Sequence, residues 1–159
     1  VFTPDLKMVD EINEHRCILE KASIRKAIAE NHAALLKSMG AACTRMTEAV
    51  ARRDPLEYTR GDMDFHNSII LAGGNRSIAS SYKRTIGPLM ALRTHLFTIM
   101  NENLGRSMSE HMSMLEACRA KNAEEAERLV GVHAAHLVDA YRLALAETSL
   151  FDGLSSGAA

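Results

Sequence analysis

The sequence predicts an all-α fold, and three observations support this prediction. Proline and glycine are scarce, with 3 Pro and 9 Gly among 159 residues. Ala, Leu, Met, Glu, Lys and Arg, which favour helices, are abundant in most windows. No window shows the alternation of apolar and polar residues that is typical of a half-buried strand. We therefore expect one antiparallel bundle of about six helices over residues 1–150, followed by a frayed tail over 151–159.

Capping residues predict the boundaries of the first three helices. Thr3 suits an N-cap with Pro4 at the first helical position, and this helix is expected to reach about Glu30. Asn31 is positioned to cap the second helix, which ends near Arg53 before the Asp-Pro restart at 54–55. The third helix is expected to end at the glycine pair 73–74, because glycine readily adopts a left-handed C-cap.

The remaining helices are separated by polar and glycine-containing breaks. Asn75 or Ser77 is expected to start the fourth helix, and Gly105 and Ser107 are expected to separate it from the fifth. The Lys-Asn dipeptide at 121–122 precedes the sixth. The fourth helix is expected to reach about residue 103. The fifth is expected to cover about residues 108–120, and the sixth about residues 123–150.

Composition excludes several classes of function. Nineteen basic against 20 acidic residues give a net charge of -1, which argues against direct binding of nucleic acid by this segment. Cys17, Cys43 and Cys118 are odd in number and form no CxxC motif, which is typical of reduced cytosolic thiols. The apolar stretches fall short of the ~20 residues of a membrane helix, and no signal sequence is visible. We therefore expect a cytoplasmic domain with no membrane partner.

Several polar residues interrupt the apolar stripes that helical spacing predicts. The inward stripe of the sixth helix contains Ala126, Val130, His133, Leu137, Ala140 and Ala144. His136 lies instead on a more polar face. His111 shares a face with the apolar residues of the fifth helix, and Asp62 and His66, four residues apart, share one face of the third.

One carboxylate and three imidazoles on converging helices would form a ligand set for a divalent transition metal. A buried, ionised Asp62 needs a partner, because its burial without compensation costs several kcal/mol. The alternative interpretation is that each histidine is an ordinary buried side chain that donates to a backbone carbonyl. The sequence leaves both interpretations open, although the complete set favours the metal.

Two arginines also interrupt apolar stripes. Arg16 lies on the face of Val9 and Ile12, and Arg93 lies on the apolar face of the fourth helix. A guanidinium inside a pocket is suited to bidentate binding of a carboxylate. An internal ion pair, or an arginine that reaches the solvent, is the alternative for each.

These residues resemble the FCD domain, the ligand-binding domain at the C-terminus of FadR-type members of the GntR transcription regulators. Residues 14–20 follow an E-x-R-x-x-L-E pattern, and Asp62 to His66 follow D-x-x-x-H. The small-Gly-Asn turn of the family resembles residues 72–75. Glu110 and the histidine after it open a helix, and a second histidine follows 22 positions after the first, at His133.

The resemblance implies a metal in the core of the bundle, bound by Asp62, His66, His111 and His133, with Zn as the first candidate and Ni and Mn as the others. It also implies a small organic-acid ligand on the open metal positions. Arg16, which falls within the family pattern, and Arg93, which matches no motif of the family, are expected to complete the anion site. The family further implies a homodimer that binds DNA only through an N-terminal winged helix-turn-helix. Nothing of that kind precedes Val1, so we expect this chain to be the sensor half of a regulator.

The preferred hypothesis is therefore an effector-sensing domain and not an enzyme. The alternative is a helical metalloenzyme that acts on a small carboxylate, because a His-rich site with open positions also suits metal-assisted hydrolysis. The sequence provides no further inward carboxylate placed as a general base and no nucleophile motif. A helical interaction module with a structural metal fits less well, because it leaves the arginines unexplained.

Overall fold

The structure, a computed structural model, is all-α and describes residues 5–85, 87 and 103–155. Its helices are α1 (Leu6–Glu30), α2 (His32–Arg52), α3 (Pro55–Ala72), α5 (Asn103–Arg119) and α6 (Ala123–Ser155). Residues 76–85 are also helical. These described ranges contain no β-strand, which confirms the predicted fold class.

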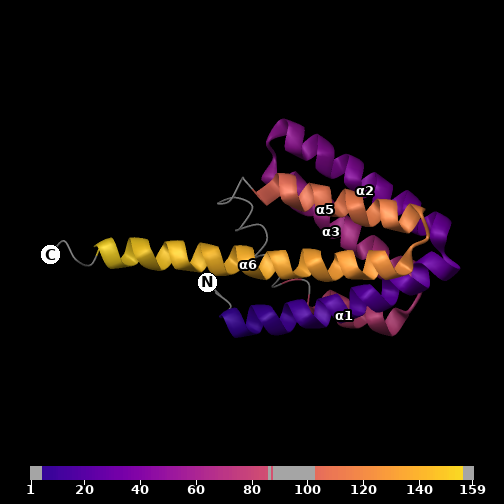
Figure 1. The fold of residues 1–159 in the computed structure, drawn as a ribbon, viewed down its shortest axis with the longest axis horizontal. Helices are drawn as coiled ribbons and strands as arrows, with labels where there is room; N and C mark the ends of the chain where they lie inside the picture. The colour runs from indigo at the N-terminus through magenta and orange to yellow at the C-terminus, as the bar shows by residue number, and fades with distance from the viewer. Residues whose placement is uncertain (1–4, 86, 88–102, 156–159) are drawn as a thin grey trace.

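The helices form a bundle in which α1 and α6 lie side by side and run in opposite directions (Figure 1). α3 packs against α1 and α2, while α5 packs against α2 and α6. α6 is the longest helix and extends beyond the rest of the bundle (Figure 1). No helix in the described part of the chain combines the length and apolar character needed to cross a bilayer.

The caps of the first helices differ in part from the prediction. Asp5, and not Thr3, caps α1, because its Oδ1 accepts from the backbone N of Met8 at 2.7 Å. A carboxylate is favourable here because it also faces the positive end of the helix dipole. Asn31 lies between α1 and α2 as expected, but its side chain caps neither helix. Its Nδ2 instead donates to the carbonyl oxygen of Ala72 at 2.8 Å, which joins the start of α2 to the end of α3.

The turns around α3 follow the prediction closely. Asp54 caps α3 by accepting from the backbone N of Glu57 at 2.9 Å, and Pro55 occupies the first turn. Gly74 has a φ of 69°, the left-handed conformation that glycine adopts readily. Asn75 then starts the helical segment 76–85 by accepting from the backbone N of Ser77 at 3.0 Å.

The last helices begin earlier and end later than the sequence predicts. α5 begins at Asn103, so Gly105 lies within the helix and the expected break there is wrong. A glycine inside a helix costs only about 1 kcal/mol, which the burial of Leu104 on the same turn offsets. α6 continues to Ser155, past the predicted end at residue 150. The rest of the predicted fourth helix, Arg93 included, lies outside the described residues.

Two apolar clusters hold the bundle together. The larger cluster is built on residues from α1, α2, α3, α5 and α6, among them Ile24, Leu35, Met39, Met46, Phe65, Ile69, Met114, Leu115 and Val130. The smaller one, Val9 with Leu137, Val138 and Tyr141, joins the start of α1 to α6.

The three cysteines are free thiols. Burial raises the pKa of Cys43 to about 11 and that of Cys118 to about 12. Both side chains belong to the larger apolar cluster, where they pack as small apolar residues. The structure therefore contains no disulfide among the three cysteines, all of which are described.

Gly73 allows the end of α3 to approach α1 closely. A Cβ added there would lie 2.9 Å from Cβ and 3.0 Å from Cα of Ser23. The φ of Gly73 is -63°, so the constraint is steric and not conformational. We expect Gly73→Ala to lower the free energy of unfolding by about 1–3 kcal/mol, measured by urea denaturation.

Gly40, within α2, provides the matched control for this substitution. A Cβ added there would meet nothing within 4 Å. Gly40→Ala should raise the free energy of unfolding by about 0.5–1 kcal/mol, because alanine favours the helix. Equal effects of the two substitutions would contradict the close approach of α1 and α3.

Candidate metal centre

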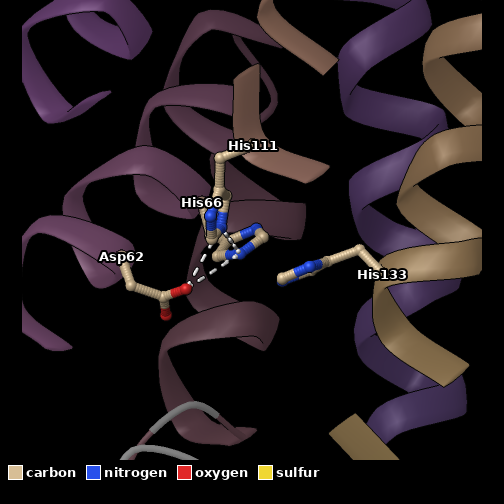
Figure 2. Close-up of side chains that lie close together, drawn as sticks. All are labelled: Asp62, His66, His111 and His133. Carbon is tan, nitrogen blue, oxygen red and sulfur yellow. Dashed lines mark hydrogen bonds and ion pairs between the residues drawn. The ribbon is translucent and has the colours of Figure 1, made fainter. Parts of the chain in front are cut away.

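Four buried side chains from three helices converge in the core (Figure 2). α3 provides Asp62 and His66 one turn apart, α5 provides His111 and α6 provides His133. One potential ligand atom from each residue lies within 4.8 Å of the others. The helices therefore bring together the four residues that the sequence singles out as metal ligands.

The distances within this group suit a single ion. Nε2 of His111 lies 3.1 Å from Oδ1 of Asp62 and 3.3 Å from Nε2 of His66, and Nε2 of His66 lies 3.7 Å from the same oxygen. The His133 ring stacks on that of His66 at a centroid distance of 5.1 Å. With metal–ligand bonds of about 2.0–2.2 Å, ligand atoms around one ion lie about 3–4.4 Å apart. The chemistry of the four donors, and the spacing of the three donors from α3 and α5, therefore fit a divalent transition metal.

The imidazole of His66 is oriented by Glu20, a residue of α1. Nδ1 of His66 donates to Oε2 of Glu20 at 3.1 Å, and both side chains are buried. This hydrogen bond assigns the proton to Nδ1 and leaves the lone pair of Nε2 directed at the other ligands. A carboxylate on the remote nitrogen is the usual partner of a metal-binding histidine, because it fixes the ring and increases its basicity.

Glu110 has the same relationship to His133. Nδ1 of His133 donates to Oε2 of Glu110 at 2.8 Å, and Oε1 of Glu110 accepts from Nδ1 of His136. Nε of Arg106 also lies 3.3 Å from Oε1. Glu110 therefore orients His133 and also accepts a hydrogen bond from His136, which remains outside the four-residue group.

Arg16 and Glu20 form an ion pair beside His66, each with about 1% of its surface exposed. Nε of Arg16 donates to Oε1 of Glu20 at 2.6 Å. Burial raises the pKa of Glu20, but the charge of Arg16 and the contacts with His66 outweigh burial and hold that pKa below its usual range. Burial lowers the pKa of Arg16, but Glu20 and Tyr82 outweigh it and the pKa is raised. Both groups are therefore ionised at neutral pH.

The guanidinium of Arg16 extends from Glu20 towards the four-residue group. Its Nη2 lies 3.1 Å from Nδ1 and 2.9 Å from Nε2 of His66. A nitrogen this close to both would overlap Cε1 if it lay in the plane of the ring, so Nη2 lies over the ring face. Nη1 of Arg16 is buried and has no hydrogen-bond partner among the described residues. It is thus a charged donor next to the candidate ligands, available to an anion.

The other histidines have local contacts away from this group. His15 Nε2 lies 3.3 Å from Oγ of Ser81, and His32 Nε2 lies 2.8 Å from the carbonyl oxygen of Cys118. His95 and Arg93 lie outside the described residues. The second arginine of the expected anion site therefore has no structural description.

Three residues of the site are not among the candidates that the sequence provides: Glu20, Glu110 and Tyr82. Glu20 follows Arg16 by four residues on the same helix face, a spacing that could have identified the pair. Glu110 directly precedes His111, and no spacing rule connects it to a histidine 23 residues further on. Tyr82, whose hydroxyl donates to Oε1 of Glu20 at 2.6 Å, looks like an ordinary core aromatic in the sequence.

The fold is thus a helical bundle whose core contains one aspartate and three histidines that could hold a metal ion. The family model of the FCD domain matches residues 11–136, well over half of the chain. The chain belongs to the FCD domain family, the effector-binding domains of GntR-type regulators. No curated protein sequence matches it significantly.

Proposed function

We propose that this domain senses a small carboxylate metabolite through a divalent transition metal bound by Asp62, His66, His111 and His133. The observation that carries the proposal is the convergence of these four buried side chains within 4.8 Å. Zn is the first candidate because a nitrogen-rich set with one carboxylate suits it, and Ni and Mn are the others. The bound ion would act as a Lewis acid with open positions for carboxylate oxygens.

Arg16 supports the carboxylate as the class of effector. Its guanidinium is held in place by Glu20, while its buried Nη1 remains available for a further acceptor. A carboxylate that reaches the metal would accept a charge-assisted hydrogen bond from this nitrogen. Binding would then satisfy a buried donor and neutralise positive charge in the same step, which favours anions over neutral ligands.

The domain acts as a regulator and not as an enzyme in this proposal. Among the described residues, the carboxylates of Glu20 and Glu110 lie next to the candidate ligands, and both are engaged in orienting histidines. In the intact regulator the domain would form a homodimer, and a winged helix-turn-helix in the same polypeptide would bind DNA. The effector changes DNA binding only if it binds one arrangement of the dimer more tightly than the other.

The test combines elemental analysis with thermal unfolding, on protein purified without chelator or metal-affinity tag. We expect about one Zn, Ni or Mn per chain, and a higher midpoint of unfolding with Zn²⁺ than with chelator. Acetate, used as a carboxylate probe, should raise the midpoint further in the Zn²⁺ form and leave the chelated form unchanged. Absence of metal after Zn²⁺ is added back, or an equal effect of acetate on both forms, would overturn the proposal.

A further inference from the structure

One carboxylate, that of Glu20, joins three separate parts of the bundle. Oε1 accepts from Nε of Arg16 on α1 and from the hydroxyl of Tyr82 in the segment 76–85, each at 2.6 Å. Oε2 accepts from Nδ1 of His66 on α3 at 3.1 Å. All four side chains are buried. Any displacement of this carboxylate therefore changes hydrogen bonds in α1, α3 and the segment 76–85 together.

The segment 76–85 depends on Tyr82 for its polar connection to the interior. It begins at the Asn75 cap, and Tyr82 has only about 2% of its surface exposed. Among the described residues, the other side-chain hydrogen bond from the segment 76–85 to α1 joins Ser81 to the half-buried His15. The Tyr82–Glu20 bond is shorter and fully buried, so it restrains the segment more strongly than the Ser81–His15 contact.

The strength of the His66–Glu20 bond depends on what Nε2 of His66 binds. A cation on Nε2 withdraws electron density from the ring, which makes Nδ1–H a stronger donor to Glu20. An anion on Nη1 of Arg16 would instead share the positive charge of the guanidinium with Glu20, which accepts from Nε and Nη2. A cation on His66 and an anion on Arg16 would thus both act on Glu20.

We infer that Glu20 is a positioning residue that transmits occupancy of the metal centre, through Tyr82, to the helical segment 76–85. This inference rests on the proposed function, because it requires a cation on His66. To that function it adds a path of hydrogen bonds by which occupancy of the site would affect another part of the bundle. A carboxylate drawn towards His66 holds the Tyr82 hydroxyl in a fixed place, so the segment becomes more ordered when the centre is occupied.

Hydrogen exchange of the full chain, with chelator and with one equivalent of Zn²⁺, tests this route. In the wild-type protein we expect Zn²⁺ to slow amide exchange in residues 76–85 by about tenfold. Tyr82→Phe removes only the hydroxyl and keeps the ring in the core. This variant should still bind one Zn²⁺ per chain, but its segment should slow by no more than about twofold on metal binding.

Ser81→Ala is the matched control, because it removes a hydroxyl from the same segment that contacts α1 without contacting Glu20. It should retain the tenfold effect of Zn²⁺ seen in the wild type. Glu20→Gln gives a second measurement, since it breaks the route at its centre. The segment should then be insensitive to Zn²⁺ even at concentrations that saturate the weakened site.

The possible outcomes separate this inference from the proposed function. If the wild type binds Zn²⁺ but exchange in residues 76–85 does not change, the route does not exist although the metal centre does. The same conclusion follows if Tyr82→Phe responds to Zn²⁺ as fully as the wild type. If the wild type binds no Zn²⁺, both the proposed function and the inference are overturned.

Discussion

Replacement of His111 by alanine is expected to remove the bound metal and carboxylate binding together. His111 is fully buried, and its Nε2 lies within 3.3 Å of both Oδ1 of Asp62 and Nε2 of His66. Loss of a partner that merely orients a ligand already weakens metal binding 10- to 100-fold, so loss of a ligand should weaken Zn²⁺ binding by more than about 100-fold. Titration calorimetry with Zn²⁺, and then with acetate, measures both effects.

Two further variants protect this test from a trivial loss of folding. His133→Ala removes a candidate ligand from a different helix, with 4% of its surface exposed against 0% for His111, and should have the same consequence for metal and acetate. His32→Ala removes a histidine whose hydrogen bond among the described residues is to the carbonyl oxygen of Cys118, away from the four-residue group. It should keep wild-type affinity for Zn²⁺. Undiminished acetate binding by metal-free His111→Ala would show that the effector does not need the metal.

Replacement of Arg16 by methionine is expected to destabilise the metal-free fold by about 3–5 kcal/mol, because it leaves the charge of Glu20 buried without its cation. Urea denaturation in the presence of chelator measures this loss. Arg25→Met is the exposed counterpart, since Arg25 pairs with Glu127 on the surface. It should cost no more than about 1 kcal/mol.

The loss of stability in Arg16→Met should depend on pH in a defined direction. In the wild type the pKa of Glu20 is held below its usual range, so the ion pair stabilises the fold above the unfolded pKa and stops doing so as pH falls through the folded value. In Arg16→Met, burial acts with less opposition and raises that pKa. The variant therefore loses stability as pH rises. The difference between the two proteins should narrow as the pH is lowered from about 7 towards about 4.3, the usual pKa of glutamate. A difference that is constant with pH would contradict a buried ionised pair.

Helical spacing predicts the inward histidines because each lies within a long apolar stripe. Val130 follows Ala126 by four residues, and His133 follows Val130 by three. His133 is buried, whereas the side chain of His136 is 28% exposed. The third and fifth helices place Asp62, His66 and His111 inward by the same rule. The prediction extends to which side chains face the core, and their role as metal ligands stays a proposal.

The partners of those histidines are not predicted, for a physical reason. The inward face of α1 contains Asn13, Arg16, Glu20 and Ser23 between apolar residues, so it does not form an apolar stripe. Each of these residues is buried because of what it meets across the bundle, as when Nδ2 of Asn13 donates to the carbonyl oxygen of Ala134. Periodicity describes one helix at a time and contains no information on such cross-helix hydrogen bonds.

Helix boundaries are predicted best where a side chain forms the cap. Asp54 and Asn75 provide short polar side chains that bond backbone N–H groups, and both helices begin where expected. Gly105 and Ser107 are expected to separate the fourth helix from the fifth, and the low helix propensity of glycine favours such a break. Packing of α5 against α2 and α6 outweighs that preference, and the helix continues through it.

The length of α6 has a mechanical consequence. This helix packs against the start of α1 as far as Tyr141 and Arg142, and its C-terminal part extends beyond the bundle (Figure 1). At a rise of about 1.5 Å per residue, residues 143–155 form an arm about 20 Å long, so a tilt of about 5° at its base moves its far end by about 2 Å. A small tilt of α6 on α1 is thus enlarged along this arm. The helix that provides one candidate ligand therefore also carries the part of the bundle that such a tilt displaces most.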